Sequence, residues 1–435
     1  MSIKRNVFLT LSVQVVSFLV SLVLNLLLPK FIDQYEYSFW QTFLLYVSFV
    51  PFFHFGFLDG IMLRYSHFDY DALNKPLMRS QVRIFLFAEI LLALIVVFFA
   101  FCYTDYLRLI LIFVGVAVVT TNFFTYQSYL FQLTNRISKY ATLVLILRLS
   151  LGLGVVIGLL MGISHFYELC FVYFAAHLIA IIWGLIKNDK LIFGESESMK
   201  VGWNEVKENV FSGAQLLVAN LSAMLLIGGA KMFVQLNFDP LVFGQVAFSF
   251  NVSNLFLTFV TAASIAIFPS LKRMDDNHIP ELYLKIRRSI TPLLFVALLS
   301  YFPGYYILGL WLPNYHSSLT YLGVLMPLII YTSRVTLLTN NYLKAYRKER
   351  TMLKINVVCL FVAFIMFAIA TYLFNSIMLL LFSLIIVVII HSTLSEFVVM
   401  KLIRCQLKKN IFIEFALVVV YIVLVLLFNG NVSSI

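Results

Sequence analysis

Apolar runs of about 20 residues recur along the whole chain, and they constrain its fold more than any other feature. A helix that crosses the hydrocarbon core of a membrane needs roughly 20 such residues. Hydrophobic residues make up 62% of the chain and charged residues only 12%, which is too apolar for a water-soluble domain. We therefore predict an all-α, polytopic membrane protein. The thirteen candidate spans are Val7–Leu28, Ser38–Phe57, Ile84–Thr104, Leu109–Leu133, Tyr140–Ile163, Tyr167–Ile186, Asn209–Val234, Leu241–Phe268, Ser289–Leu310, Leu319–Leu343, Ile355–Phe374, Ser376–Met400 and Ile411–Phe428.

The order of features around residue 209 repeats the order at the N-terminus, which indicates two copies of one unit. The matching positions are Asn6–Phe8 with Asn209–Phe211, Glu36 with Asp239, and Arg64 with Arg273. We predict two pseudo-symmetric six-helix lobes. Their predicted bounds are 1–186 for the first lobe, 187–208 for a cytoplasmic amphipathic linker, 209–400 for the second lobe and 401–435 for a basic segment with an extra span. Because that last span contains Glu414, it could also lie at the interface or pack on the rim.

The distribution of basic residues predicts the orientation. Cytoplasmic loops of membrane proteins collect Lys and Arg. With the N-terminus inside, the 31 basic residues leave only Lys30 and Arg108 outside and three within spans. The net charge of +11 is then an orientation signal in a cytoplasmic (inner) membrane protein, and we expect no nucleic-acid partner.

Ionisable residues inside spans are costly, and each is a candidate for function. At a rise of 1.5 Å per residue, Arg148 lies roughly 12 Å and Arg334 roughly 13–14 Å from the cytoplasmic ends of their spans. His177 comes out at nearly the same level. Arg148 and Arg334 are therefore predicted to line a cavity, although each could instead pair with Glu89 or with a backbone carbonyl. For His177, a packing role competes with proton transfer.

The remaining embedded charges carry weaker signals. Lys231 lies near the outer end of its span, where its side chain could extend to the interface. Glu89 is predicted to be shallow and to neutralise Arg83 or Arg148. The acidic residues Glu396 and Glu414 are interpreted as residues near span ends. We find no acidic residue at mid-depth, which argues against the export of cationic drugs.

Arginines in a membrane cavity favour an anionic cargo. Guanidinium groups bind phosphate and carboxylate through two parallel hydrogen bonds. A low-dielectric wall strengthens their field on an anion. An anionic amphiphile is the natural cargo of such a cavity.

The whole chain resembles the Wzx-type polysaccharide-unit flippases of the multidrug/oligosaccharidyl-lipid/polysaccharide exporter superfamily. The resemblance lies in the paired opening hairpins and in the segments Phe55–Gly60 with Arg64, Pro269 with Arg273, Tyr129–Lys139 and Tyr342–Lys354. It implies two lobes around a central cavity that opens alternately inward and outward. Arg148 and Arg334, with Lys231 as a third candidate, correspond in kind to the family's cavity cations.

The same resemblance implies a function in bacterial O-antigen or capsule assembly. The cargo would be an undecaprenyl-pyrophosphate-linked oligosaccharide, moved from the inner to the outer leaflet. Partners would be membrane lipids, H⁺ or Na⁺ and polysaccharide polymerase machinery, with His177 and Glu89 as candidates for ion coupling. No nucleotide-binding or hydrolase motif occurs, so we predict no enzyme and no cofactor or metal. A multidrug exporter and a membrane glycan polymerase or acyltransferase remain alternatives.

Overall fold

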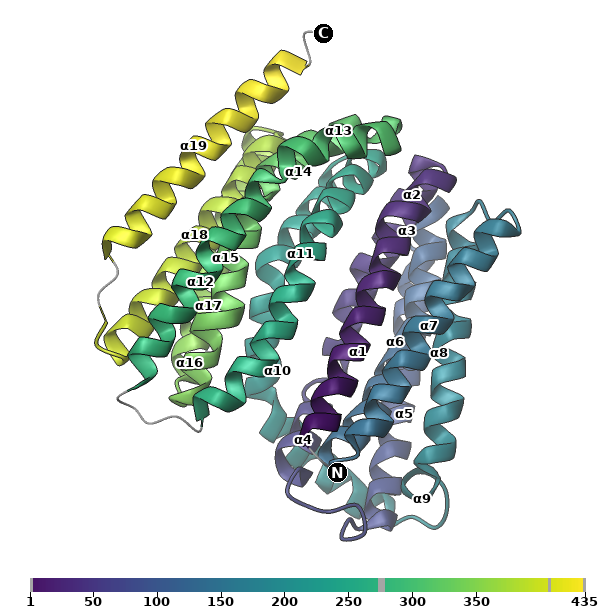
Figure 1. The fold of residues 1–435 in the computed structure, drawn as a ribbon. Coiled ribbons are helices and arrows are strands. Elements are labelled where there is room, and N and C mark those ends of the chain that lie inside the picture. Colours follow the sequence, from purple (N-terminus) through teal and green to yellow (C-terminus); the bar gives the residue numbers. More distant parts are fainter. Residues whose placement is uncertain (1–2, 273–277, 406–407, 433–435) are drawn as a thin grey trace. The chain divides into compact units, whose positions relative to one another are not determined.

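A computed structural model describes residues 3–272, 278–405 and 408–432, and every regular element among them is helical. The chain forms two compact units, Met1–Leu221 and Ser222–Ile435. Figure 1 shows the helices of each unit running side by side. The all-α prediction is confirmed for the described residues, while Arg273, which contributed to the repeat, lies outside them.

The first unit is built around long helices that pack against one another, with α5 on α6, and α7 on both α8 and α1. Its elements are α1 (Ile3–Leu22), η1 (Val23–Leu27), α2 (Leu28–Phe31), α3 (Gln34–Phe49), η2 (Val50–His54), α4 (Phe57–Tyr65), α5 (Lys75–Ala100), α6 (Asp105–Leu133), α7 (Ile137–Leu160), α8 (Phe166–Lys187), α9 (Asp189–Ile192) and the first half of α10 (Met199–Asn237).

The second predicted span is bent rather than straight. The segment Gln34–His54 meets α4 at 53°. Pro51 lies in the intervening η2, and a proline lacks the N–H that a regular helix needs. Phe55 and Gly56 follow with positive φ angles of 48° and 85°, so the chain turns there before α4 begins.

The second unit continues from α10. Its further elements are α11 (Pro240–Lys272), α12 (Ile279–Leu299), α13 (Tyr301–Trp311), η4 (Pro313–Tyr315), α14 (His316–Leu325), α15 (Pro327–Arg334), η5 (Val335–Thr339), α16 (Asn340–Ala345), α17 (Glu349–Ala368), η6 (Ile369–Leu373), α18 (Ile377–Leu402) and α19 (Lys408–Val432). Here α17 packs on α18, and α11 packs on α14, α15 and α16.

Two more bends interrupt predicted spans in this unit. The angle is 41° between α12 and α13, and 43° between Pro313–Leu325 and Pro327–Ala345. Pro303 and Pro327 explain these bends, because in a regular helix each proline ring would clash with the backbone carbonyl four residues earlier. Helix α12 begins at Ile279, before the predicted span Ser289–Leu310.

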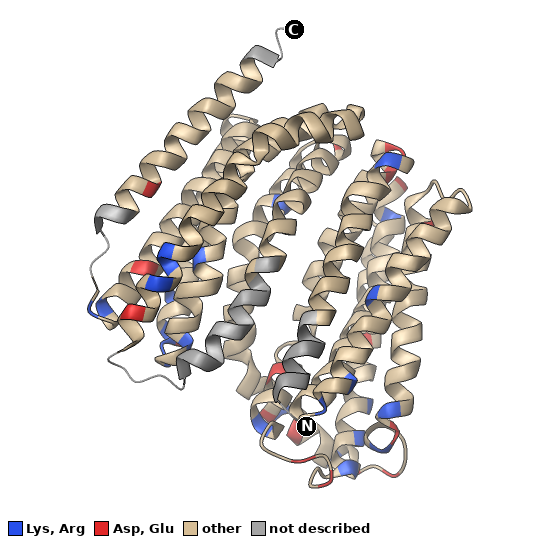
Figure 2. Cartoon of the chain, in the orientation of Figure 1, with Lys and Arg blue, Asp and Glu red and all other residues tan. Residues whose placement is uncertain are grey.

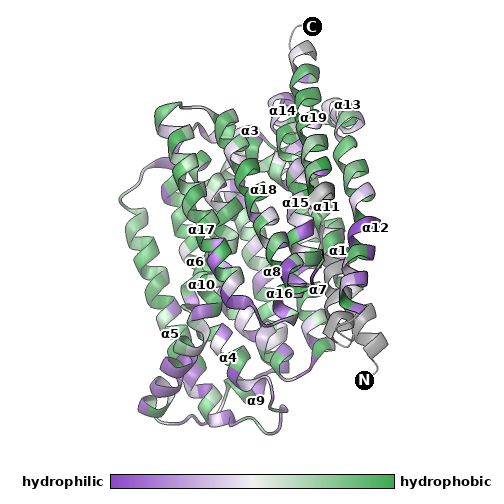
Figure 3. Ribbon diagram, turned by 90° about the vertical axis from the view of Figure 1, so that its left-hand side faces the viewer, coloured by the Kyte–Doolittle hydropathy of each residue, from purple (hydrophilic) through white to green (hydrophobic). Residues whose placement is uncertain are grey.

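Among the described residues, ten helices are long and apolar enough to cross a membrane, or up to thirteen when each bent pair is counted as one span. This agrees with the thirteen predicted spans, and Ile411–Gly430 is among the ten. Figure 3 shows apolar residues along most helices and hydrophilic residues gathered around α4 and α9. The protein is a multi-pass membrane protein.

The boundary between the two units lies later than the predicted linker. Helix α10 runs unbroken for 39 residues, and the boundary falls within it, after Leu221. Its first half packs on α4 without side chains between them. A Cβ added to Gly60 would lie 1.8 Å from the carbonyl oxygen of Asn209, and one added to Gly213 would lie 2.0 Å from that of Gly56. Close backbone contact therefore holds this half-helix in the first unit.

Polar contacts reinforce that packing. Asn209 Nδ2 donates to Gln81 Oε1 at 2.7 Å, and Arg64 Nη1 donates to Asn209 Oδ1 at 2.7 Å. Arg64 also forms an ion pair with Glu205, whose carboxylate accepts a hydrogen bond from Tyr65 at 2.6 Å. The predicted linker helix is therefore an integral part of the first unit.

Candidate functional site

Arg148 lies near the midpoint of α7, an apolar helix of 24 residues. Its side chain is exposed on the first unit. It has no hydrogen-bond or ion-pair partner among the side chains that the structure describes. The ionisable groups that it influences electrostatically are Tyr140, Tyr173 and His177. Arg148 is therefore a cation in an apolar helix, and no described side chain neutralises its charge.

His177 is on α8 and is 4% exposed. Its Nδ1 donates to the carbonyl oxygen of Tyr173 at 2.9 Å. Its ring lies 4.1 Å from the Tyr173 ring and 5.7 Å from the Phe124 ring, measured between centroids. These contacts satisfy one ring nitrogen and pack both faces, which favours a packing role.

Glu89 lies near the middle of α5, because this helix begins nine residues before the predicted span. The carboxyl group is 1% exposed. Asn122 Nδ2 donates to Glu89 Oε2 at 2.8 Å and to the carbonyl oxygen of Val50 at 3.1 Å. No ion pair of Glu89 occurs within the described part of the chain.

The partners predicted for Glu89 are engaged elsewhere or not bonded to it. Arg83 donates instead to the Ser196 hydroxyl at 2.7 Å and to the Gly194 carbonyl at 2.8 Å. Asn122 Oδ1 is buried and has no hydrogen-bond partner among the described residues. Glu89 is therefore a buried acid of the first unit, beside an amide oxygen without a described partner, and its predicted depth stays a prediction.

Lys231 lies in the part of α10 that belongs to the second unit. Its Nζ sits 4.8 Å from the centroid of the Phe250 ring, a residue of α11 that is 1% exposed. A cation over an aromatic face is attracted by the ring quadrupole. Lys231 thus contacts the aromatic side chain of Phe250 on the neighbouring helix.

Arg334 is at the end of α15 and is only 2% exposed. Its Nη2 lies 2.5 Å from Glu414 Oε2. Arg287, on α12, joins the same group, because its Nη2 lies 2.8 Å from Glu414 Oε2 and its Nε 2.7 Å from Glu396 Oε1. Two arginines and two glutamates form this buried network. For Arg334 the structure favours pairing over an open cavity, and the partner is Glu414 rather than Glu89.

The network also explains how α19 attaches. Glu414, Val418, Tyr421 and Val425 form the buried stripe of that helix. Tyr421 donates to the Gly323 carbonyl on α14 at 3.1 Å. Glu396 and Glu414 are 2% and 5% exposed, so their interpretation as residues near span ends missed their burial. Part of the signal was available in the sequence, because Glu396, Glu414 and Arg334 lie within predicted spans of the same half and Arg287 lies just before one.

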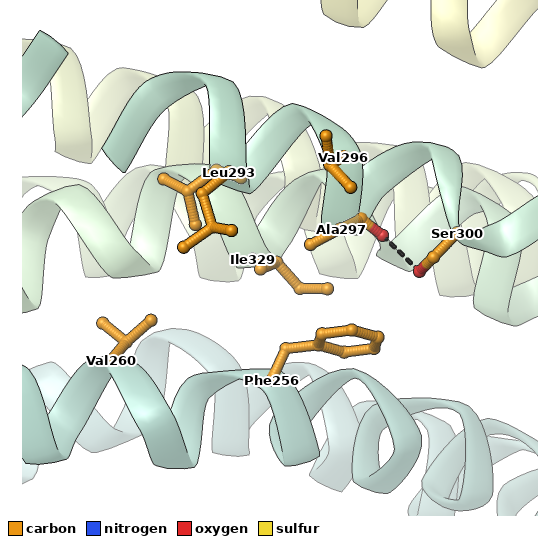
Figure 4. A pocket seen from close by; sticks show the side chains of 8 residues that line it. Phe256, Val260, Leu293, Val296, Ala297, Ser300 and Ile329 are labelled. Atoms are coloured by element: carbon orange, nitrogen blue, oxygen red, sulfur yellow. Dashed lines mark hydrogen bonds between the residues drawn. The ribbon is translucent and has the colours of Figure 1, made fainter. Parts of the chain in front are cut away.

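A cavity of about 350 Å³ lies in the second unit, among α11, α12 and α15 (Figure 4). Phe256 and Val260 face Leu293, Val296, Ala297 and Ile329 across it. Among the described lining residues, the one hydroxyl is that of Ser300, and it donates to the Ala297 carbonyl at 2.6 Å. The cavity is suited to an alkyl or isoprenoid chain rather than to a polar ligand.

Charged residues are sparse along the helices of both units. Figure 2 shows Lys and Arg gathered toward the end of the first unit where the chain begins. No group of three or more metal-ligating side chains occurs within the residues described. Arg148, Glu89 and His177 belong to the first unit and Arg334 and Lys231 to the second, so the predicted convergence of Arg148 and Arg334 on one vestibule stays a prediction.

No protein-family model and no curated protein matches the sequence. Several solved structures match the fold. An inward-facing multidrug resistance MATE family transporter of the MOP superfamily gives a TM-score of 0.62 at 10% identity, over 92% of this chain and 98% of that one. An outward-facing MATE family transporter gives 0.52 at 10% identity, over 92% and 94%. A MOP superfamily transporter from Pyrococcus furiosus gives 0.50 at 8% identity, over 92% and 95%.

The chain therefore has the two-lobed, all-α fold of the MATE transporters of the MOP superfamily. The fold that the sequence resemblance implied is therefore confirmed, and membership of the superfamily stays a prediction. The narrower resemblance to Wzx-type flippases stays a prediction.

Proposed function

We propose that this protein is a flippase, not an enzyme, that moves undecaprenyl-pyrophosphate-linked oligosaccharide units by alternating access. It would carry them from the inner to the outer leaflet of the bacterial cytoplasmic membrane, for O-antigen or capsule assembly. One observation carries the proposal: Arg148 is an exposed guanidinium near the middle of an apolar helix, with no partner among the described side chains. An unneutralised cation at such a position calls for water or an anion beside it.

The chemistry of Arg148 fits a pyrophosphate headgroup. A guanidinium presents donors in a planar fork that matches two phosphate oxygens. Lys231 is a second candidate contact. We do not include Arg334 as a cargo ligand. It is paired with Glu414 in the network that also contains Arg287, so an anion would have to displace the Glu414 carboxylate.

The apolar cavity supports an amphiphilic cargo. Its lining of Phe256, Val260, Leu293 and Ile329 suits the isoprenoid part of a lipid-linked sugar. A cargo of this class has two requirements. Its charged headgroup needs a cation such as an arginine, and its apolar chain needs lipid or a groove of this kind. The polymerase that would use the flipped unit is a proposed partner.

The proposal is tested by following the lipid-linked unit in cells that depend on this protein. Arg148→Ala should slow translocation roughly 10- to 100-fold, since a charged hydrogen bond contributes about 1.5–3 kcal/mol. Units should accumulate on the inner leaflet, and Arg148→Lys should recover part of the rate. Arg108→Ala is the matched control, because Arg108 is exposed and donates to the Tyr103 carbonyl outside the predicted cavity. Normal translocation by Arg148→Ala would refute the proposal.

A multidrug exporter is the second candidate, and Glu89 favours it. A buried carboxylate can attract a cationic drug or a coupling ion. The same cells distinguish the two functions: an exporter would change drug resistance through Glu89→Gln and leave lipid-linked units unaffected. A polymerase or acyltransferase defect would instead leave single units already displayed outside.

A further inference from the structure

The connection between α16 and α17 is rich in positive charge, and the proposed transport mechanism makes no use of it. Residues 344–354 hold five cations and one acid, Glu349. The five cationic side chains are exposed, and no hydrogen bond or ion pair engages them within the described part of the chain. They belong to Lys344, Arg347, Lys348, Arg350 and Lys354. A positive surface therefore remains open to an anion.

Packing within the second unit places two more cations at the same end. Leu343, near the end of α16, shares a buried apolar cluster with Val399 and Ile403, near the end of α18. Lys401 and Arg404 lie in the same stretch of α18 and the turn that follows it, and both are exposed. Charges from two connections of the chain therefore lie beside one apolar cluster.

One face of α17 continues from these charges into apolar surface. Arg350 and Lys354 lie one helical turn apart, and Val358, Phe361 and Ile365 follow on the same face. These three apolar side chains are 57%, 68% and 45% exposed on a helix that is a candidate membrane span. From Lys354 to Ile365 the helix rises about 16 Å, close to half of a hydrocarbon core of roughly 30 Å. The face thus offers positive charge at the start of the span and apolar contact through one leaflet.

The first unit contains a turn with the same backbone. Lys348 N donates to the Leu343 carbonyl at 2.8 Å, and Arg136 N donates to the Phe131 carbonyl at 2.8 Å. The residue before each donor has a positive φ angle, 51° in the second unit and 54° in the first. The connection between α6 and α7 is therefore the structural counterpart of the one between α16 and α17.

The two counterparts differ in charge. With the turns aligned, Ser138 and Thr142 of α7 take the places of Arg350 and Lys354. Farther along the same face, α7 keeps exposed leucines where α17 has its apolar residues. The first unit therefore has the apolar part of this face without the cations, which makes it an internal comparison for the second.

We propose that the face of α17 from Arg350 to Ile365 binds an anionic phospholipid. Its phosphate would lie at Arg350 and Lys354, and one acyl chain would follow Val358 and Phe361 into the membrane. Lys and Arg clusters beside a membrane span are typical contacts of acidic lipid headgroups. A soluble anion would leave the apolar part unused, and a neutral lipid would leave the charges without a partner. Neither the site nor its test depends on the proposed transport function.

The test uses purified full-length protein in detergent and palmitoyl-oleoyl-phosphatidylglycerol as the probe. Native mass spectrometry counts the lipids retained during a titration, and palmitoyl-oleoyl-phosphatidylcholine is the neutral comparison. The wild type should retain the anionic lipid at lower concentrations than the neutral one. Combining Arg350→Gln with Lys354→Gln should weaken this binding roughly 25-fold, since each cation near the membrane surface contributes roughly fivefold. Equal retention of the two lipids by the wild type would overturn the proposal.

Two controls separate a lipid site from a diffuse charge effect. Lys139→Gln combined with Lys187→Gln removes two exposed cations of the first unit and should leave the binding as in the wild type. Equal weakening by both double variants would mean that only net charge matters, and would overturn the proposal. Dihexanoyl-phosphatidylglycerol has the same headgroup but chains too short to reach Ile365, so it should bind more weakly. Equal affinity for the short and long lipids would reduce the site to one for a free headgroup and overturn the lipid assignment.

The counterpart in the first unit allows a gain of binding. Combining Ser138→Arg with Thr142→Lys would place two cations above the exposed leucines of α7. This variant should retain one more molecule of palmitoyl-oleoyl-phosphatidylglycerol than the wild type. The Tm of each variant is measured in the same detergent to confirm that it is folded. A folded variant that retains no additional lipid would contradict the proposal that paired cations on such a face form the site.

Discussion

The two units place charge inside apolar helices in different ways. In the first, Arg148 and Glu89 are single charges on separate helices, one exposed and one buried, and neither has an ion-pair partner among the described residues. In the second, Arg287, Arg334, Glu396 and Glu414 share one buried network in which the charges balance. Residues of the same type, predicted at the same depth, therefore differ in what they can still bind.

This difference separates stability from function. A balanced network holds helices together but has little charge left for a ligand, and removing one member leaves a buried charge uncompensated. A single charge contributes little to the fold and is available to a cargo or an ion. The comparison predicts that the second unit loses stability when an embedded charge is removed, and that the first unit loses binding or transport.

The largest effect should follow from removing one acid of the network. Glu414→Gln leaves Arg287 and Arg334 facing a single remaining carboxylate, that of Glu396. We expect unfolding to become easier by about 3–5 kcal/mol, the usual cost of breaking a buried pair. Thermal unfolding of the purified protein would measure it.

A compensating variant sharpens this prediction. Combining Glu414→Gln with Arg334→Met removes one charge of each sign, so the double variant should recover part of the lost stability. Glu208→Gln is the control for an exposed acid. An unchanged Tm for Glu414→Gln would show that the network does not hold α19.

An intermediate effect is expected in the first unit, where close packing rather than charge attaches a helix. Gly213→Ala would place a Cβ 2.0 Å from the Gly56 carbonyl oxygen, so α10 must shift away from α4. Overpacking of this kind costs about 1–3 kcal/mol. Gly304→Ala is the control, because no heavy atom lies within 4 Å of its added Cβ. Equal Tm values for the two variants would contradict the close contact.

The smallest effect on stability is expected at Arg148. Arg148→Met removes an exposed side chain without a described partner, so the free energy of unfolding should change by no more than about 0.5 kcal/mol. Measured beside Glu414→Gln, this variant tests the comparison directly. A loss of stability as large as that of Glu414→Gln would mean that Arg148 is paired and that the two units do not differ.

The spans were predictable because their signal is local. Runs of apolar residues predict thirteen spans without knowledge of packing, and the described residues hold ten such helices, or up to thirteen with the bent pairs. The prolines that cause the bends, Pro51, Pro303 and Pro327, are also visible in the sequence. A prediction based on hydropathy alone does not take them into account. Their effect depends on which carbonyl each proline ring faces, which is a property of the folded helix.

The partners of the embedded charges could not be predicted in the same way. Glu414 is 127 residues from Arg287 along the chain, and the ion pair exists only because α19 packs beside α14. Arg148 and Arg334 have the same local signal, an arginine inside an apolar run. Arg148 and Arg334 differ in which helix packs beside each of them. For Glu89 the local sequence did not reveal that the side chain is buried and accepts a hydrogen bond from Asn122 on another helix.

Helix α10 has a practical consequence for anyone who would divide this protein. With 39 residues it is about 58 Å long, and it supplies the last helix of one unit and the first of the other. Cutting the gene at residues 187–208, where a connector was predicted, would strip the N-terminal fragment of the helix that covers Gly60. Fragments or chimaeras should be joined beyond Leu221, and even there one continuous helix would be cut.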